Sequence, residues 1–188
     1  MKNIVILASG NGSNAQNIAE YFAGRKDVNL PLILCNKKDA YVFERAKKLG
    51  ISSRLIRRDS FDTDELVNEL KNIPADLIVL AGFLWLVPER WVKAFPKRIV
   101  NIHPALLPKF GGKGMYGEKV HEAVVAAREK QSGITIHLID EHYDKGTTLF
   151  QATCPVAEND TPDDVARKVH ALEYQHFPHV IDEYLQTL

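Results

Sequence analysis

The sequence predicts an α/β protein built on a doubly wound, mostly parallel sheet, with antiparallel additions in its C-terminal third. Two patterns predict this fold class. Short continuous apolar runs alternate with helix-like segments through the first two thirds of the chain, which is typical of a βαβ series. In the last third, two strand-like segments follow each other directly, which predicts a hairpin. A chain of 188 residues suits one domain, and we expect residues 1–188 to form it.

Ile4–Ala8 opens the series as an apolar run typical of a strand that is buried on both faces. Gly50 is expected to end the second helix, and Asp62 and Thr63 are candidate caps of the third. The elements expected after the first strand are a helix at Ala15–Ala23, a strand at Leu30–Cys35, a helix at Tyr41–Leu49, a short strand near Arg54–Ile56, a helix at Asp64–Asn72, a strand at Leu77–Leu80, a short helix at Pro88–Phe95 and a strand at Ile99–Ile102.

The expected hairpin consists of the strands Gly133–Asp140 and Thr147–Val156. The final helix begins with Thr161 as its cap and Pro162 at its first position. Pro178 is expected to kink or end that helix, because proline removes a backbone donor.

A glycine-rich segment separates the two parts of the chain. Four glycines lie within Phe110–Gly117, and such a composition resists regular structure and predicts mobility. We expect Gly111–Gly117 to be either a lid over a site or an inert surface insertion, and the sequence leaves both interpretations open.

Composition excludes several classes of protein. Lys plus Arg and Asp plus Glu both number 24, so no basic excess predicts binding to nucleic acid or to an anionic membrane. The apolar run at the N-terminus is too short for a signal peptide, and no run reaches the ~18 residues of a membrane span. Cys35 and Cys154 lack metal-type spacing and are expected to be buried free thiols. We therefore expect a soluble cytoplasmic protein.

The stretch Asn101-Ile102-His103-Pro104 carries the first candidate site. Successive strand residues alternate sides, so Asn101 and His103 are expected on one face, and Pro104 ends the strand beside a loop. The pair combines an amide donor with a side chain that titrates near physiological pH. Acyl-type transfer requires that combination of an oxyanion stabiliser and an acid/base.

The loop Ser9–Ala15 is the second candidate site. A strand, two glycines and the start of a helix form an anion site, for which phosphate is the usual guest. Gly10, Gly12 and Ala15 also satisfy the G-x-G-x-x-A pattern of dinucleotide-binding proteins. An acidic ribose ligand is missing after the second strand, where Lys37 and its neighbours would instead suit a 2′-phosphate. An NADP-binding oxidoreductase is therefore the rival interpretation.

No histidine arrangement predicts a metal site, because neither H-E-x-x-H nor a paired Cys/His set is present. His176 and His179 are expected to form a solvated or partly packed helix face. A carboxylate near His103, such as Asp144, would favour its imidazolium form. Composition alone makes Asp144 an ordinary turn acid.

Several segments together resemble the glycinamide ribonucleotide formyltransferases, a family of folate-dependent enzymes with a Rossmann-like fold. The resemblance covers nearly the whole chain, and its most specific element is Asn-x-His-Pro with a downstream Asp. Methionyl-tRNA formyltransferase and formyltetrahydrofolate deformylase share that element, but each is expected to carry an extra domain. The segments are Gly12-Ser13-Asn14, Asn36-Lys37-Lys38-Asp39-Ala40, Glu44-Arg45-Ala46, Leu80-Ala81-Gly82-Phe83, Asn101-Ile102-His103-Pro104, Leu106-Leu107-Pro108-Lys109 and His137…Asp144.

The resemblance implies a role for each matching residue. It implies a catalytic trio of Asn101, His103 and Asp144. It implies that phosphoribosylglycinamide binds Gly12, Ser13, Asn14, His170 and Glu173, with Glu173 as acceptor for the glycinamide end. It implies that folate binds Leu84, Trp85, Leu86, Val87, Asn101, Asp140, Glu141, His142, Tyr143 and Asp144.

The implied reaction is formyl transfer from 10-formyltetrahydrofolate to the ribonucleotide's amine, without a metal. Residues 1–100 would form the phosphate-binding half, and residues 101–188 the catalytic and folate half. No activated Ser, Cys or Lys lies in these motifs, so we expect direct transfer through a tetrahedral intermediate. The expected partners are small molecules and a second copy in a homodimer. The alternatives are the NADP-binding oxidoreductase, another formyl-folate enzyme such as a formyltetrahydrofolate hydrolase, and a non-enzymatic nucleotide-binding module.

Overall fold

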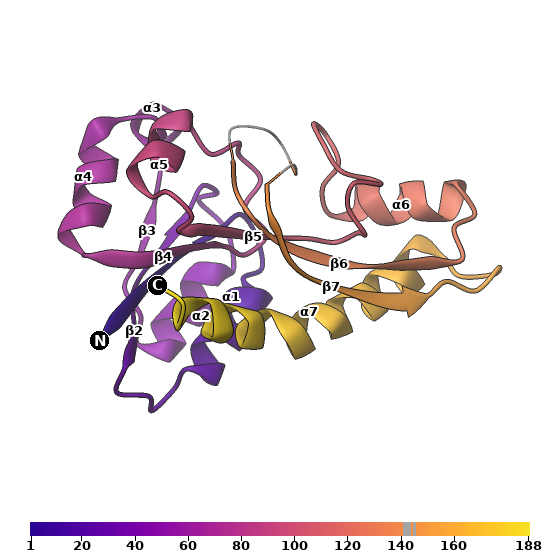
Figure 1. Cartoon of the computed structure of the whole chain (residues 1–188), viewed down its shortest axis with the longest axis horizontal. Helices are drawn as coiled ribbons and strands as arrows, with labels where there is room; N and C mark the ends of the chain where they lie inside the picture. Colours follow the sequence, from indigo (N-terminus) through magenta and orange to yellow (C-terminus); the bar gives the residue numbers. More distant parts are fainter. Residues whose placement is uncertain (141–143, 145) are drawn as a thin grey trace.

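The computed structural model describes residues 1–140, 144 and 146–188. Its strands form one sheet in the order β3-β2-β1-β4-β5-β6-β7 (Figure 1). Pairing is parallel from β3 through β5 and antiparallel for β6 and β7, which confirms the predicted fold class. The strands are β1 Lys2–Ala8, β2 Val28–Cys35, β3 Ser53–Leu55, β4 Ala75–Leu80, β5 Ile99–His103, β6 Gln131–Leu138 and β7 Thr148–Pro155.

Helices cover both faces of the sheet (Figure 1). One side carries α1, α2 and the long α7, and the other carries α3, α4 and α5. Helix α6 packs against α7. The helices are α1 Ser13–Tyr21, α2 Val42–Leu49, α3 Arg58–Phe61, α4 Asp64–Asn72, α5 Glu89–Ala94, α6 Glu118–Ala126 and α7 Pro162–Leu185.

Strand β1 shows why its sequence is continuously apolar. Ile4 and Ile6 face the core beneath α1, α2 and α7, whereas Val5 and Leu7 face the core beneath α3, α4 and α5. All four side chains are fully buried. Because alternate residues of a strand point to opposite faces, a strand covered on both sides must be apolar at every position.

The expected elements are all present, with ends shifted by one or two residues in most cases. Gly50 caps α2 in the left-handed conformation, and Thr63 caps α4 by accepting from the Leu66 N–H. Two helices were not expected from the sequence, the single turn α3 and the nine-residue α6. Cys35 and Cys154 are buried free thiols, as predicted. No helix among the described residues is long and apolar enough to cross a membrane.

Pro178 does not end α7, which continues to Leu185. Proline has no N–H to donate to the carbonyl four residues earlier, which belongs to Tyr174. The Asn17 side chain of α1 donates to that carbonyl at 2.9 Å instead. The freed acceptor is therefore satisfied across the interface between the two helices, and α7 can continue past the proline.

Candidate active site

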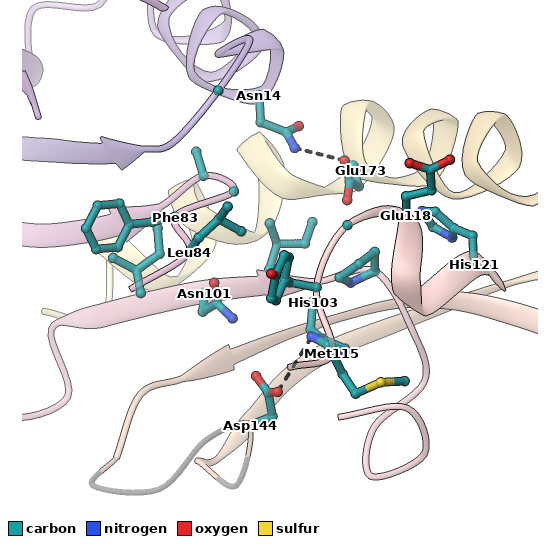
Figure 2. A pocket seen from close by; sticks show the side chains of 18 of the residues that line it. Asn14, Phe83, Leu84, Asn101, His103, Met115, Glu118, His121, Asp144 and Glu173 are labelled. Carbon is teal, nitrogen blue, oxygen red and sulfur yellow. Dashed lines mark hydrogen bonds and ion pairs between the residues drawn. The ribbon is translucent and has the colours of Figure 1, made fainter. Parts of the chain in front are cut away.

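A cavity of about 820 Å³ lies where the strand order reverses, at the carboxyl ends of β1 and β4. Open α/β sheets bind ligands at this switch point. Five parts of the chain contribute to its wall: the loop after β1, the loop after β4, the end of β5, the segment before α6 and the N-terminal half of α7 (Figure 2). One cavity therefore joins the two sites that the sequence predicts separately.

The loop after β1 leads into α1 through Gly12, which has φ +77°. Among the described residues no side chain caps this helix, so its first N–H groups are available to bind an anion in the cavity. A Cβ on Gly12 would lie 2.4 Å from Cγ2 of Val42, so glycine is required here for both conformation and space.

We expect Gly12→Ala to weaken binding of the phosphorylated substrate and to lower the thermal midpoint of unfolding. The strained φ and the clash with Val42 must displace the loop that presents the N–H groups. Gly10→Ala is the matched control, because a Cβ on Gly10 meets nothing within 4 Å. Titration calorimetry with the ribonucleotide and thermal melts of both variants check this. Equal behaviour of the two variants would contradict it.

Asn14 links this loop to α7. Its Nδ2 donates to Oε2 of Glu173 at 2.9 Å (Figure 2). Nδ1 of His170 lies 2.9 Å from the same oxygen. Glu173 is only 5% exposed. Oδ1 of Asn14 is buried without a hydrogen-bond partner among the described residues. An unsatisfied buried acceptor beside a carboxylate suits a ligand that presents O–H or N–H groups.

The Glu173 carboxylate raises the pKa of His170 above its ordinary value. We expect Glu173→Gln to return that pKa towards ~6.5 because the charge partner is lost. Since the folded pKa lies above the unfolded one, this interaction stabilises the fold most fully below pH ~6.5. Its contribution is lost as the pH rises through the folded pKa. NMR titration of His170 in both proteins checks this, and an unchanged pKa would contradict it.

Strand β6 places His137 directly opposite Asn101 of β5. Directly opposed residues share a sheet face, so both side chains lie on the same side. Nδ2 of Asn101 lies 3.1 Å from Nε2 of His137, and Nδ1 of His137 lies 3.1 Å from its neighbour's carbonyl oxygen, that of Leu138. His137 is fully buried, and burial lowers its pKa.

His103 lies two residues beyond Asn101 and also faces the cavity (Figure 2). Its Nδ1 is 3.7 Å from Oδ2 of Asp144, and its Nε2 donates to the Phe110 carbonyl at 2.7 Å. Asp144 is held in turn by the Gly112 N–H, which donates to Oδ2 at 2.8 Å. Both ring nitrogens of His103 therefore face oxygen acceptors.

The loop after β4 forms an apolar wall of the cavity. Leu84 and Leu86 are each 39% exposed, whereas Val87 is buried. Trp85 packs against Phe61, with ring centroids 5.3 Å apart. An exposed apolar wall of this kind suits a flat aromatic ligand.

The structure brings most of the predicted site residues to this cavity. Asp140 is half-buried just after β6 and is not among the described residues that line the cavity, whereas its neighbour Ile139 is. The predicted folate contacts Glu141, His142 and Tyr143 lie outside the described residues. The predicted residues that line the cavity are Gly12, Ser13, Asn14, Leu84, Trp85, Leu86, Val87, Asn101, His103, Asp144, His170 and Glu173.

Two histidines of this region were missed as site residues. His137 contacts Asn101 through strand pairing, and the late His137…Asp144 spacing was its only signal in the sequence. His121 of α6 lines the cavity with Nδ1 buried and unpartnered among the described residues. Burial lowers the pKa of His121, so its neutral form is favoured.

The glycine-rich segment also contributes to the wall through Gly112–Gly117. Its position in the cavity wall favours the lid over an inert surface insertion. No three His, Cys, Asp or Glu side chains gather to hold a metal ion within the part of the chain that the structure describes.

His176 packs against Phe150, and His179 packs against Tyr21, which confirms a partly packed helix face.

Fold and cavity together define a ligand-binding α/β protein, and comparison with known proteins gives its family. A family described as formyl transferase matches residues 2–181. The chain belongs to the formyl transferase family. Membership replaces the dinucleotide-binding interpretation of the Gly10–Ala15 loop.

The relatives it resembles carry a more particular name. The chloroplastic phosphoribosylglycinamide formyltransferase of Arabidopsis thaliana is 41% identical over 187 residues, which are 96% of this chain and 64% of the relative. The chain spans 60% of the Vigna unguiculata protein of the same name. Phosphoribosylglycinamide formyltransferase of Bacillus subtilis (strain 168) is 32% identical over 98% of this chain and 95% of its own length.

Solved structures agree with these matches. Glycinamide ribonucleotide transformylase 1 from Symbiobacterium toebii superposes with a TM-score of 0.90 at 32% identity, covering 100% of this chain and 89% of that one. Phosphoribosylglycinamide formyltransferase from Streptococcus pneumoniae TIGR4 has a TM-score of 0.85 at 37% identity, with 97% and 98% covered.

Proposed function

We propose that the protein transfers the formyl group of 10-formyltetrahydrofolate to the amine of glycinamide ribonucleotide in purine biosynthesis. The products are formylglycinamide ribonucleotide and tetrahydrofolate. One observation carries the proposal. In this member of the formyl transferase family, a single cavity joins the glycine loop after β1 to Asn101, His103 and Asp144. A phosphorylated acceptor anchored at one end can thus present its amine at the other.

The two substrates bind against different walls of the cavity. The phosphate binds the free N–H groups at Gly12, Ser13 and Asn14. Glu173 and His170 bind the ribonucleotide's hydroxyl or glycinamide groups, which fits the buried acceptors at this end of the cavity. The pterin ring of the folate lies along Leu84–Val87, towards Asn101 and Asp144.

The amine nitrogen attacks the formyl carbon and forms a new N–C bond. The formyl oxygen becomes an oxyanion in the tetrahedral intermediate. Asn101 donates an Nδ2–H to that oxyanion, and the second Nδ2–H remains on His137. A preorganised donor in a water-excluded site is the usual main source of such stabilisation.

His103 and Asp144 carry out the proton transfer. The bond from carbon to N10 of the folate breaks as N10 gains the Nε2–H proton of His103, after that N–H leaves the Phe110 carbonyl that accepts it here. The former amine then loses one proton, which Nε2 of His103 takes up, so the ring returns to its starting state. Asp144 faces Nδ1 and stabilises positive charge on the ring. The segment around Phe110 thereby acts as a lid.

We propose a single formyltransferase domain, with residues 1–100 binding phosphate and residues 101–188 carrying the catalytic groups. The reaction needs no metal ion, because the developing charge is met by Asn101 and His103. Only small-molecule substrates are required by this chemistry.

Incubation with glycinamide ribonucleotide and 10-formyltetrahydrofolate tests the proposal. We expect folate absorbance to change only when both substrates are present. Ligand binding without turnover would favour the nucleotide-binding module. Stabilisation of the protein by NADPH but not by folate would favour the oxidoreductase. Either result would overturn the proposal.

A further inference from the structure

We propose that His137 is a positioning residue that sets the orientation of the Asn101 amide through a single tautomer of its ring. This inference rests on the proposed function for its catalytic consequence, but its structural part stands alone. It assigns a task to the most buried histidine near the cavity, which no step above requires as an acid or base.

The tautomer follows from the contact of Nδ1. A carbonyl oxygen only accepts, and Nδ1 lies 3.1 Å from that of Leu138, so Nδ1 must carry the proton. In the neutral ring, Nε2 then holds a lone pair. Asn101 lies 3.1 Å from Nε2 and must direct its Nδ2–H rather than its oxygen towards it.

That orientation determines where the remaining amide N–H points. One Nδ2–H is bound to His137, and the other is left for the cavity that Asn101 lines. If Nε2 of His137 were protonated, it and Nδ2 of Asn101 would be two donors facing each other. That arrangement would favour a flipped amide, with the Asn101 oxygen towards Nε2. The flipped amide would present its carbonyl oxygen to the forming oxyanion, which is repulsive.

The charged surroundings of His137 oppose each other. Asp144, whose Oδ1 lies 3.6 Å from Nε2, and Asp140 at the end of β6 favour the imidazolium. Burial opposes it most strongly, and His103 on β5 adds to that effect. The net direction is a lowered pKa, so the ring stays neutral at pH 7.

Two substitutions separate positioning from packing. His137→Gln can keep an acceptor near the position of Nε2, whereas His137→Asn keeps a polar group near Nδ1 and cannot reach Asn101. We expect His137→Asn to lower kcat by about 100-fold, as the loss of an oxyanion donor does, with little change in KM. His137→Gln should recover a clear part of that loss.

A double-mutant cycle gives the sharpest readout. If His137 acts through Asn101, then Asn101→Ala with His137→Asn should be no slower than Asn101→Ala alone. A merely structural role would instead give multiplied losses and equal defects for the Gln and Asn variants. Either of those results would overturn the proposal.

The wild-type protein provides a test without variants or substrates. Nitrogen-15 NMR of the histidine rings should show His137 protonated on Nδ1 and bare on Nε2 at pH 7. A proton on Nε2 at that pH would overturn the inference. Failure of the proposed function is distinct, because it would appear as wild-type protein that does not transfer formyl while this tautomer is present.

Discussion

Asn101→Ala is expected to lower kcat for formyl transfer by about 100-fold to 1,000-fold while KM for both substrates changes little. The Nδ2–H acts on the oxyanion, which exists only beyond the ground state, so its loss raises the barrier without weakening substrate binding. Steady-state kinetics with each substrate varied in turn measures the two parameters separately.

Asn101→Asp is the matched control because it keeps the shape of the side chain and replaces the donor by an acceptor. We expect it to be at least as slow as the alanine variant. We expect both variants to fold, because Asn101 is only half-buried. Thermal melts check this. Wild-type turnover in either variant would remove Asn101 from the mechanism.

His103→Ala is expected to reduce kcat by a factor of about 100 or more, because the donor to the leaving nitrogen and a positive charge are both lost. Asp144→Asn is its companion, since the amide retains an oxygen for the Gly112 N–H but no charge for His103. We expect that variant to lose less than His103→Ala.

The pH dependence separates the two roles. Because Asp144 stabilises positive charge on the His103 ring, the activity of the Asp144→Asn protein should decline at a lower pH than wild-type activity does as the pH is raised. We therefore measure kcat against pH with melts at the same pH values. Profiles of the variant and the wild type that coincide at equal rates would contradict the assignment of Asp144.

The sequence was sufficient to place the loop after β1, Asn101 and His103 at the same edge of the sheet, because each lies at the end of a buried strand. Residues at the carboxyl ends of parallel strands meet at one edge of the sheet, so local patterns implied a shared site. The glycines at the loop after β1 and the proline after His103 mark those ends clearly.

Contacts across the sheet could not be predicted in the same way. His137 meets Asn101 through the register of antiparallel β5 and β6, which depends on packing of the whole sheet. Helix α6 was missed because it follows a glycine-rich segment, although Val120 and Val124 are buried at helical spacing. That α7 does not end at Pro178 could not be predicted, because the carbonyl freed by the proline is satisfied from α1, far away in sequence.

The most direct test of the central claim follows the formyl carbon itself. The protein is mixed with 10-formyltetrahydrofolate labelled with carbon-13 in the formyl group and with glycinamide ribonucleotide, and the products are identified by NMR. The account predicts that the label appears in the amide of formylglycinamide ribonucleotide. Label recovered as free formate would identify a hydrolase and contradict it.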